Sequence, residues 1–341
     1  MVTIAAALVV AAGQAWAQEQ TRVVEGTIVN ATDGGGETGG LPVTLHQIAA
    51  EGPLDLQTES DTRGGVRFEG IKYDPARAYG VSVRYQGAIY GTDLDLSAGS
   101  PAPLSITVYD ASSDDAIVYV ASASLLLAAV DKASQTVAAL EIVDLANVSD
   151  HAYVPGAQPM QLLRFGLPPG ATALQVTTAL IDADYAQVDR GFALFASVPP
   201  GRHQLTFSYW FPYEDDSITL EKSYRYGADS VRVLAPIEVL SISFPTLGEP
   251  ETIRIGERQF QLIETSGVAR GEGLSIRLGG LPKSSLADRV REGLDDIRFE
   301  HVAPAALATL MLALLAYGVF WKGRDTGPQQ RPERGDEPPE R

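Results

Sequence analysis

The sequence contains no cysteine and only four histidines among 341 residues. Without cysteine there can be no disulfide, no thiolate metal site, no cysteine nucleophile and no covalent haem attachment through a C-x-x-C-H motif. Lipid attachment to a cysteine behind an export signal is excluded for the same reason. Any membrane anchor must therefore be a segment of the chain itself.

Positive charge is also scarce, since 26 Lys and Arg stand against 43 Asp and Glu and give a net charge of −17. A surface with this charge repels phosphate backbones, which excludes nucleic acid as a partner. Hydrophobic residues make up 45% and charged residues 20% of the chain, a composition typical of folded domains.

Hydrolase motifs are absent: there is no G-x-S-x-G, no H-E-x-x-H, and no S-x-x-K followed by K-T-G. A zinc site normally needs three clustered donors, and no two of the histidines share metal-ligand spacing. These residues are His46, His151, His203 and His301. We therefore expect no catalytic residue, no metal site and no cofactor, and we interpret the protein as not an enzyme. Paired carboxylates of glycosidases have no motif, so a glycan- or peptide-processing enzyme stays an alternative.

Two apolar segments lie near the ends of the chain. Ile4 to Ala12 is an unbroken apolar run, and Ala15-Trp16-Ala17 follows with small residues where signal peptidase cleaves. Residues 1–17 are thus predicted to be a signal peptide, although Met1-Val2-Thr3 lacks the usual basic residue, which we interpret as a misassigned start codon. Val302 to Trp321 carries no charge and as a helix spans roughly 30 Å, which predicts a transmembrane helix.

Lys322 and Arg324 directly follow the apolar segment 302–321, which favours a cytoplasmic C-terminus. Together with the signal peptide, this predicts a single-pass protein of the cell membrane whose bulk is extracytoplasmic, either periplasmic or extracellular. Residues 284–301 have a helix-capping sequence and apolar residues at helical spacing, and are predicted to form a juxtamembrane amphipathic helix. Residues 322–341 are expected to form a disordered cytoplasmic tail.

The N-terminal part, from Thr21 to Asp95, alternates apolar and polar residues over short stretches bounded by turn residues. Such alternation is typical of half-buried antiparallel strands. It is clearest in two stretches, Val66 with Phe68, and Val81 with Val83 and Tyr85.

Residues 18–100 resemble the carboxypeptidase regulatory-like domain, a transthyretin-like β-sandwich with a carbohydrate-binding-like fold, related to the Cna B-type modules. The matching segments are Glu25 to Asn30, Leu41 to Leu45, Thr58 to Phe68, and Tyr79 to Val83. The resemblance implies the fold of this segment rather than a function, because such modules serve as spacers, adhesion units and carbohydrate-binding folds. Lys72 is the only lysine here, and the Lys–Asn isopeptide pair of some Cna-type modules has no counterpart.

Pro101-Ala102-Pro103 marks a boundary, and residues 101–235 are predicted to form a second β-sandwich. Ala116 to Val130 and Thr136 to Asn147 indicate two long strands joined by a polar turn. Pro168-Pro169-Gly170 and Pro199-Pro200-Gly201 separate the later strands. Residues 236–283 add strands that either complete this sandwich or form a small third β module. The predicted fold class is all-β, with tandem antiparallel β-sandwiches and one C-terminal transmembrane helix.

Four residues are predicted to face the two cores: Phe68, Val83, Leu174 and Phe207. The aromatic string Tyr209 to Tyr213 would suit a glycan or partner platform, but aromatic enrichment in strands favours alternate core and surface residues on a strand and its turn.

Three acidic stretches offer oxygen ligands for Ca²⁺, but none matches an EF-hand loop, and we interpret them as solvated loops. They are Asp93 with Asp95, Asp110 to Asp115, and Glu214 to Asp216. The sequence singles out no ligand-binding residue.

The strand-rich, motif-free ectodomain indicates a non-catalytic, membrane-anchored binding or scaffold protein that recognises an envelope protein or a glycan. An accessory subunit of a larger membrane complex is the alternative. Small residues of the apolar segment, among them Ala305, Ala316 and Gly318, would let a helix pack closely against other membrane spans.

Overall fold

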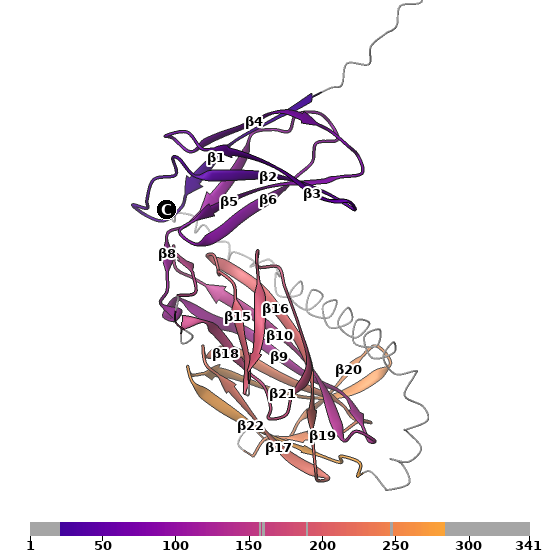
Figure 1. Ribbon diagram of the computed structural model, residues 1–341. Coiled ribbons are helices and arrows are strands. Elements are labelled where there is room, and N and C mark those ends of the chain that lie inside the picture. Colours follow the sequence, from indigo (N-terminus) through magenta and orange to yellow (C-terminus); the bar gives the residue numbers. More distant parts are fainter. Residues whose placement is uncertain (1–20, 157, 159–160, 189, 246–247, 284–341) are drawn as a thin grey trace, which may run out of the picture. The chain divides into compact units, whose positions relative to one another are not determined.

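The computed structural model describes residues 21–156, 158, 161–188, 190–245 and 248–283 (Figure 1). Within these residues the fold is all-β, as predicted, and includes a short 3-10 helix, η1 (Asp115–Ile117). No helix in this part of the chain is long and apolar enough to cross a membrane. The predicted signal peptide, the helices over 284–301 and 302–321, and the tail 322–341 lie outside the described residues.

The chain divides into two compact units. The first comprises the described residues up to Ser112 together with residues 150–154. The second comprises residues 113–149 and the described residues from 155 onward. The first unit thus extends beyond Pro101, the position of the predicted boundary. It also includes a short segment from later in the sequence, residues 150–154.

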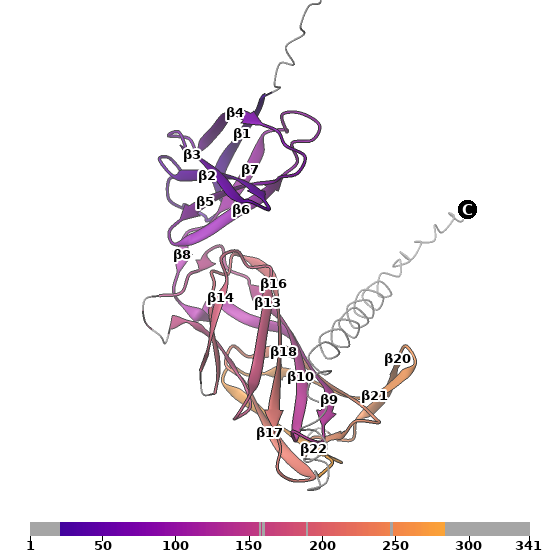
Figure 2. The same cartoon turned by 45° about the vertical axis from the view of Figure 1, so that its right-hand side comes forward.

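The two larger sheets of the first unit are a three-stranded sheet of order β4-β1-β7 and a four-stranded sheet of order β3-β2-β5-β6 (Figure 2). The strands are β1 (Thr21–Asn30), β2 (Pro42–Ala49), β3 (Gly52–Glu59), β4 (Gly65–Lys72), β5 (Ala78–Tyr85), β6 (Ala88–Leu94) and β7 (Leu104–Val108). β1 and β7 pair in parallel, whereas the other pairs are antiparallel.

The core of the first unit is built from alternate residues of both sheets. On β4, Val66 and Phe68 are buried while Arg67 between them is exposed. On β5, Val83 and Tyr85 are buried in the same way. They join one apolar cluster with residues of β1, β2, β6 and β7. The alternation predicted from the sequence is confirmed, and this unit is a β-sandwich.

Residues 150–154 complete the first unit. β11 (Ala152–Tyr153) pairs in parallel with β8 (Ala111–Ser112). The Thr32 hydroxyl donates to the Asp150 carbonyl oxygen at 2.7 Å, and Ala152 is fully buried in the core of this unit. A segment that follows two long strands of the second unit is therefore part of the first.

A seven-stranded sheet of order β13-β16-β10-β9-β18-β21-β20 and two three-stranded sheets, β12-β15-β14 and β17-β22-β19, form the second unit. Their bounds are β9 (Val118–Asp131), β10 (Thr136–Asn147), β12 (Leu163–Gly166), β13 (Thr172–Thr178), β14 (Asp184–Val188), β15 (Gly191–Phe195), β16 (Gly201–Pro212), β17 (Ser217–Tyr224), β18 (Ala228–Pro236), β19 (Ser241–Ser243), β20 (Glu251–Ile255), β21 (Arg258–Val268) and β22 (Glu272–Gly279). β9 and β18 pair in parallel, so the large sheet is mixed rather than purely antiparallel as predicted, whereas both small sheets are antiparallel.

Both small sheets cover the same face of the large sheet. Phe165 of β12 and Phe192 of β15 lie against Phe207 of β16, with ring centroids 6.0 and 5.0 Å from it. Lys222 of β17 reaches Glu141 of β10, the residue paired with Phe207 in the sheet. The second unit is therefore also a β-sandwich.

The strands after residue 235 belong to these same sheets: β20 and β21 extend the large sheet, and β19 and β22 pair beside β17. Of the two alternatives left by the sequence, residues 236–283 thus complete the second sandwich. Among the predicted core residues, Phe68, Val83 and Phe207 are buried. Leu174 is only half-buried, because its strand β13 lies at the edge of the large sheet.

Candidate functional site

Two strand edges of the second unit lie side by side. β13 ends the seven-stranded sheet and β14 ends a three-stranded sheet. Side chains of β14 bridge the edges: the Tyr185 hydroxyl donates to the Leu174 carbonyl oxygen at 3.3 Å, and Gln187 Nε2 donates to the Ala171 carbonyl oxygen at 2.7 Å. The edge of β13 is therefore partly protected by side-chain donors, whereas every residue of β14 is exposed.

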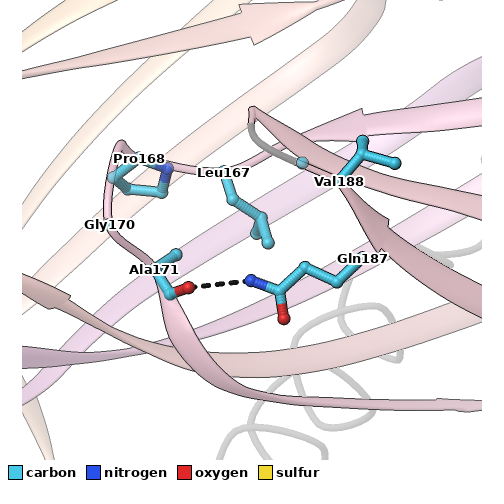
Figure 3. A pocket seen from close by; sticks show the side chains of 7 residues that line it. Leu167, Pro168, Gly170, Ala171, Gln187 and Val188 are labelled. Atoms are coloured by element: carbon cyan, nitrogen blue, oxygen red, sulfur yellow. Dashed lines mark hydrogen bonds between the residues drawn. The ribbon is translucent and has the colours of Figure 1, made fainter.

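A pocket of about 420 Å³ lies beside this pair of edges. It is lined by Leu167, Pro168, Gly170, Ala171, Gln187, Val188 and Gly191. In Figure 3 the Gln187 side chain reaches across to the Ala171 carbonyl, with Leu167 between the Pro168 turn and Val188. One wall is thus the Pro-Pro-Gly turn seen in the sequence, and the other is the β14–β15 hairpin.

Glycine is required at Gly191 in this hairpin. Its φ is +153°, a conformation that side-chain-bearing residues rarely adopt. A Cβ at this position would also collide with the Phe165 carbonyl oxygen. Gly191 therefore lets β15 lie close to β12 while the chain turns out of β14.

Large apolar side chains are exposed on and beside the same hairpin. Val188 is 54% exposed, Ile181 45%, Phe195 41% and Tyr185 37%. Strand alternation places Val188 and Phe195 on one face of the hairpin and Tyr185 on the other, toward β13. Single exposed apolar residues are ordinary, but several around one hairpin and its pocket suit an interaction surface. We call these four residues, with the pocket, the hairpin surface.

A charged pair lies inside the core of the second unit. Lys222 Nζ is 2.6 Å from Glu141 Oε1, and it donates a second hydrogen bond to the Gly166 carbonyl oxygen at 2.8 Å. The Tyr209 hydroxyl donates to Glu141 at 2.7 Å. Burial, followed by the charge of Glu141, raises the pKa values of Tyr209 and Tyr224. Both phenols are therefore neutral at ordinary pH.

A carboxylate organises one end of the first unit. Asp110 Oδ1 accepts hydrogen bonds from the Tyr85 hydroxyl at 2.7 Å and from Asn30 Nδ2 at 2.8 Å. Gln86 Nε2 and the Gly36 amide also donate to this carboxylate. These bonds, the one from Tyr85 most of all, lower the pKa of Asp110. The carboxylate is thus saturated with internal donors and joins a loop to two strands.

The structure does not bring the described histidines together. His46 contacts Asp55 and Ser82 in the first unit. His151 contacts its neighbour Asp150, and His203 contacts the Pro199 carbonyl oxygen. His301 lies outside the described residues. In the part of the chain that the structure describes, no three His, Asp or Glu side chains are grouped as a metal site would require.

The acidic stretches have separate structural roles. Asp114 accepts a hydrogen bond from the Ala116 amide and caps η1, and Asp115 pairs with Arg225 and Arg270. Asp95 accepts a hydrogen bond from the Ser97 amide.

The aromatic string is divided by strand alternation: Tyr209, Phe211 and Tyr213 are buried. Between them, Trp210 is half-buried and Pro212 is exposed, which is the alternation expected from the sequence.

The hairpin surface had no counterpart in the sequence interpretation. β14 reads DYAQV and has exposed residues throughout, so it lacks the alternation that marks a half-buried strand. The repeated Pro-Pro-Gly sequence did indicate a turn at residues 168–170. It did not indicate that this turn would lie beside the edge of β14.

No protein-family model matches the chain, and no curated protein matches its sequence. Solved structures with some similarity include the M1 zinc metallopeptidase from Deinococcus radiodurans, at 11% identity and a TM-score of 0.29. They also include a variant of it bound to a Tyr-Ser-Ala substrate, at 12% identity and a TM-score of 0.30. Each match covers 48% of this chain and 42% of the other chain. This likeness assigns neither a family nor an activity.

Proposed function

We propose that this chain is a non-catalytic binding or scaffold protein, held to a membrane by residues 302–321 with its β units outside the cytoplasm. In this proposal residues 1–17 are a cleaved signal peptide, and the first unit is a carboxypeptidase regulatory-like module that serves as a spacer. The observation that carries the binding role is the hairpin surface of the second unit.

The hairpin surface suits a protein segment better than a glycan. Its exposed side chains are mainly apolar, and aromatic and aliphatic anchors beside a pocket are typical of protein recognition. The outer edge of β14 also offers backbone donors and acceptors, because β14 pairs with β15 on one side only. An extended partner segment could add a strand there and place a side chain in the pocket. An envelope protein is therefore the partner class we favour.

The experiment is a pull-down of the tagged full-length chain after gentle detergent extraction of its own membranes. We expect a stoichiometric partner that is lost when Val188, 54% exposed, is changed by Val188→Asp. The matched control is Ile237→Asp, which places the same charge on another exposed apolar residue of the second unit, 42% exposed. Loss of the partner from both variants, or from neither, would contradict recognition by the hairpin surface.

The same pull-down addresses the accessory-subunit alternative. If the partners are integral membrane proteins that persist in Val188→Asp but are lost when residues 302–321 are replaced by an unrelated membrane span, the chain acts as a subunit through its helix. Turnover of glycans or peptides by the purified chain, abolished by a single carboxylate substitution, would instead establish an enzyme.

A further inference from the structure

Two small sheets cover the large sheet of the second unit, and they are not hydrogen-bonded to each other as one sheet. We call the boundary between them, where β12 of one sheet lies beside β17 of the other, the division. Two hydrogen bonds cross the division. Lys222 Nζ donates to the Gly166 carbonyl oxygen at 2.8 Å, and the Arg164 amide donates to the Tyr226 hydroxyl at 2.7 Å. A pocket of about 20 Å³ lies in this division, with room for about one water molecule.

The lining of this pocket is positively charged. Arg164, Lys222 and Arg225 line it together with a single carboxylate, Glu141. The charge of Lys222 is balanced by Glu141, and its Nζ uses two of its three donors on Glu141 and the Gly166 carbonyl. The two arginines are therefore the cations whose charge is not neutralised inside the pocket.

The ion pairs around the pocket cancel only part of this charge. Asp115 is near Arg225, at 3.4 Å, but it pairs more closely with Arg270, at 2.9 Å. With these two added, four cationic side chains face two carboxylates, which leaves a charge of +2. A local excess of positive charge is unusual in a chain whose net charge is −17.

The two arginines also have unused hydrogen-bonding capacity. Arg164 Nε and Arg225 Nε are buried, and neither has a hydrogen-bond partner among the residues that the structure describes. Buried donors are normally paired, because leaving one unpaired costs free energy. A guanidinium presents its donors as a planar fork that matches the oxygens of a carboxylate or a phosphate.

Tyr226 holds the cationic groups in place. The guanidinium carbons of Arg225 and Arg270 lie 5.9 and 5.6 Å from its ring centroid, within the range of cation–π attraction. Arg270 is further fixed by donating to the Val118 carbonyl oxygen at 2.8 Å. Of the two proposed ligands, Arg225 is therefore positioned before any ligand arrives, which lowers the entropic cost of binding.

We propose that the division between β12 and β17 binds a small oxyanion, a carboxylate or a phosphate, with Arg164 and Arg225 as its direct ligands. The pocket itself has room for about one water molecule and both Nε atoms are buried, so the oxyanion sits at its mouth and contacts the outer nitrogens of the two guanidinium groups, which belong to partly exposed side chains. It binds as an isolated ion or as a group on a larger ligand. This site lies on other residues than the hairpin surface and does not depend on the proposed function.

Ligand-observed NMR on the purified full-length chain tests the proposal at constant ionic strength. The probes are inorganic phosphate, followed by its phosphorus linewidth, and trifluoroacetate, followed by its fluorine linewidth. We expect the chain to broaden at least one signal. Broadening of phosphate alone, of trifluoroacetate alone or of both assigns the oxyanion class, and no broadening of either overturns the proposal.

Variants locate the binding. Arg164→Gln with Arg225→Gln should weaken the affinity by about tenfold or more, as expected when charge-assisted hydrogen bonds are removed. Arg232→Gln, the control, removes one arginine charge from an exposed pair with Glu264, away from the pocket, and should leave the broadening unchanged. Equal broadening by the double variant and the control would overturn the site.

Ser223 offers a second variant that keeps both arginines. It lines the pocket and its side chain is exposed, so Ser223→Glu should fold normally and place a carboxylate at the mouth. We expect this variant to compete with the probe and abolish the broadening. Unchanged broadening in a Ser223→Glu protein with a normal melting temperature would show that the anion binds elsewhere.

Discussion

Lys222 and Glu141 form an ion pair within the core of the second β-sandwich, with side chains that are 5% and 2% exposed. Burying two charges costs desolvation energy, which their attraction offsets only when further hydrogen bonds satisfy both groups. The Tyr209 hydroxyl and the Gly166 carbonyl provide these bonds. The pair joins β17 to β10, and so ties a small sheet to the large one.

Removal of one partner should be far more damaging than removal of both. We expect Lys222→Met to lower the free energy of unfolding by about 3–5 kcal/mol, because the Glu141 carboxylate is left buried and unpaired. The double variant Lys222→Met with Glu141→Leu should recover most of this loss. Urea denaturation measures the free energy of unfolding of both variants. The control Arg232→Met removes one partner of an exposed pair with Glu264 and should cost less than about 1 kcal/mol. A double variant as unstable as Lys222→Met alone would argue against an energetic coupling between Lys222 and Glu141.

The stability of the first unit should depend on pH through Asp110. Hydrogen bonds from Tyr85 and then Asn30 lower the pKa of Asp110 in the folded state below 3.8. The stabilisation is therefore complete above pH 3.8 and is lost as the pH falls through the lower folded value. We expect Asp110→Asn to destabilise the unit at neutral pH and to flatten its acid-induced loss of stability.

Urea denaturation of the Asp110 variant at a series of pH values measures this dependence. Asp93→Asn, which changes an exposed carboxylate on β6 of the same unit, is the control and should leave the acid profile unchanged. The same acid profile in the wild type and in Asp110→Asn would refute the role of this carboxylate.

Substitutions of Phe68 and Phe207 should each lower the stability of a different unit. Each is buried, at 5% and 1% exposure, in the core of its own sandwich. Truncation to Ala should cost about 3–5 kcal/mol, because a large cavity is left behind. Calorimetry of Phe68→Ala should show a lower melting temperature for the first unit and little change for the second, and the reverse for Phe207→Ala. A single transition shifted equally by both variants would mean that the units unfold together.

Gly191 should be intolerant of a side chain. Gly191→Ala would strain the backbone and collide with the Phe165 carbonyl, so we expect a loss of about 1–3 kcal/mol. Gly166 is paired with Gly191 across the sheet, and its nearest neighbour would lie 3.9 Å from an added Cβ. Gly166→Ala is thus the matched control, and thermal melting compares the two. Equal melting temperatures would show that the hairpin adjusts to the methyl group.

Much of the fold could be predicted because strand alternation is a local property. The strands with one buried face, such as those around Val66 and Val83, had clear patterns, as did the long strands on either side of the Asp131 turn. β14 and β3 were not predicted, because both run mostly exposed along sheet edges and therefore do not alternate strongly.

The polar features could not be predicted, because their partners are far apart in the sequence. Glu141 and Lys222 are separated by 81 positions, and neither lies in a pattern that indicates burial. Likewise Asn30 and Asp110 are 80 positions apart. The hairpin surface arises only when the edges of two sheets meet, and alternation within each strand carries no information on which edges become neighbours.

The return of residues 150–154 to the first unit has a consequence for the order in which the chain folds. Ala152 fills the core of this unit and pairs through β11 with β8, but it is synthesised only after β9 and β10. A growing chain that has emerged only as far as Ser112 therefore lacks part of its N-terminal core. The first β-sandwich can be completed only after β9 and β10, the first hairpin of the second sandwich, have been synthesised. Maturation of the two units is thus interleaved in time rather than strictly successive.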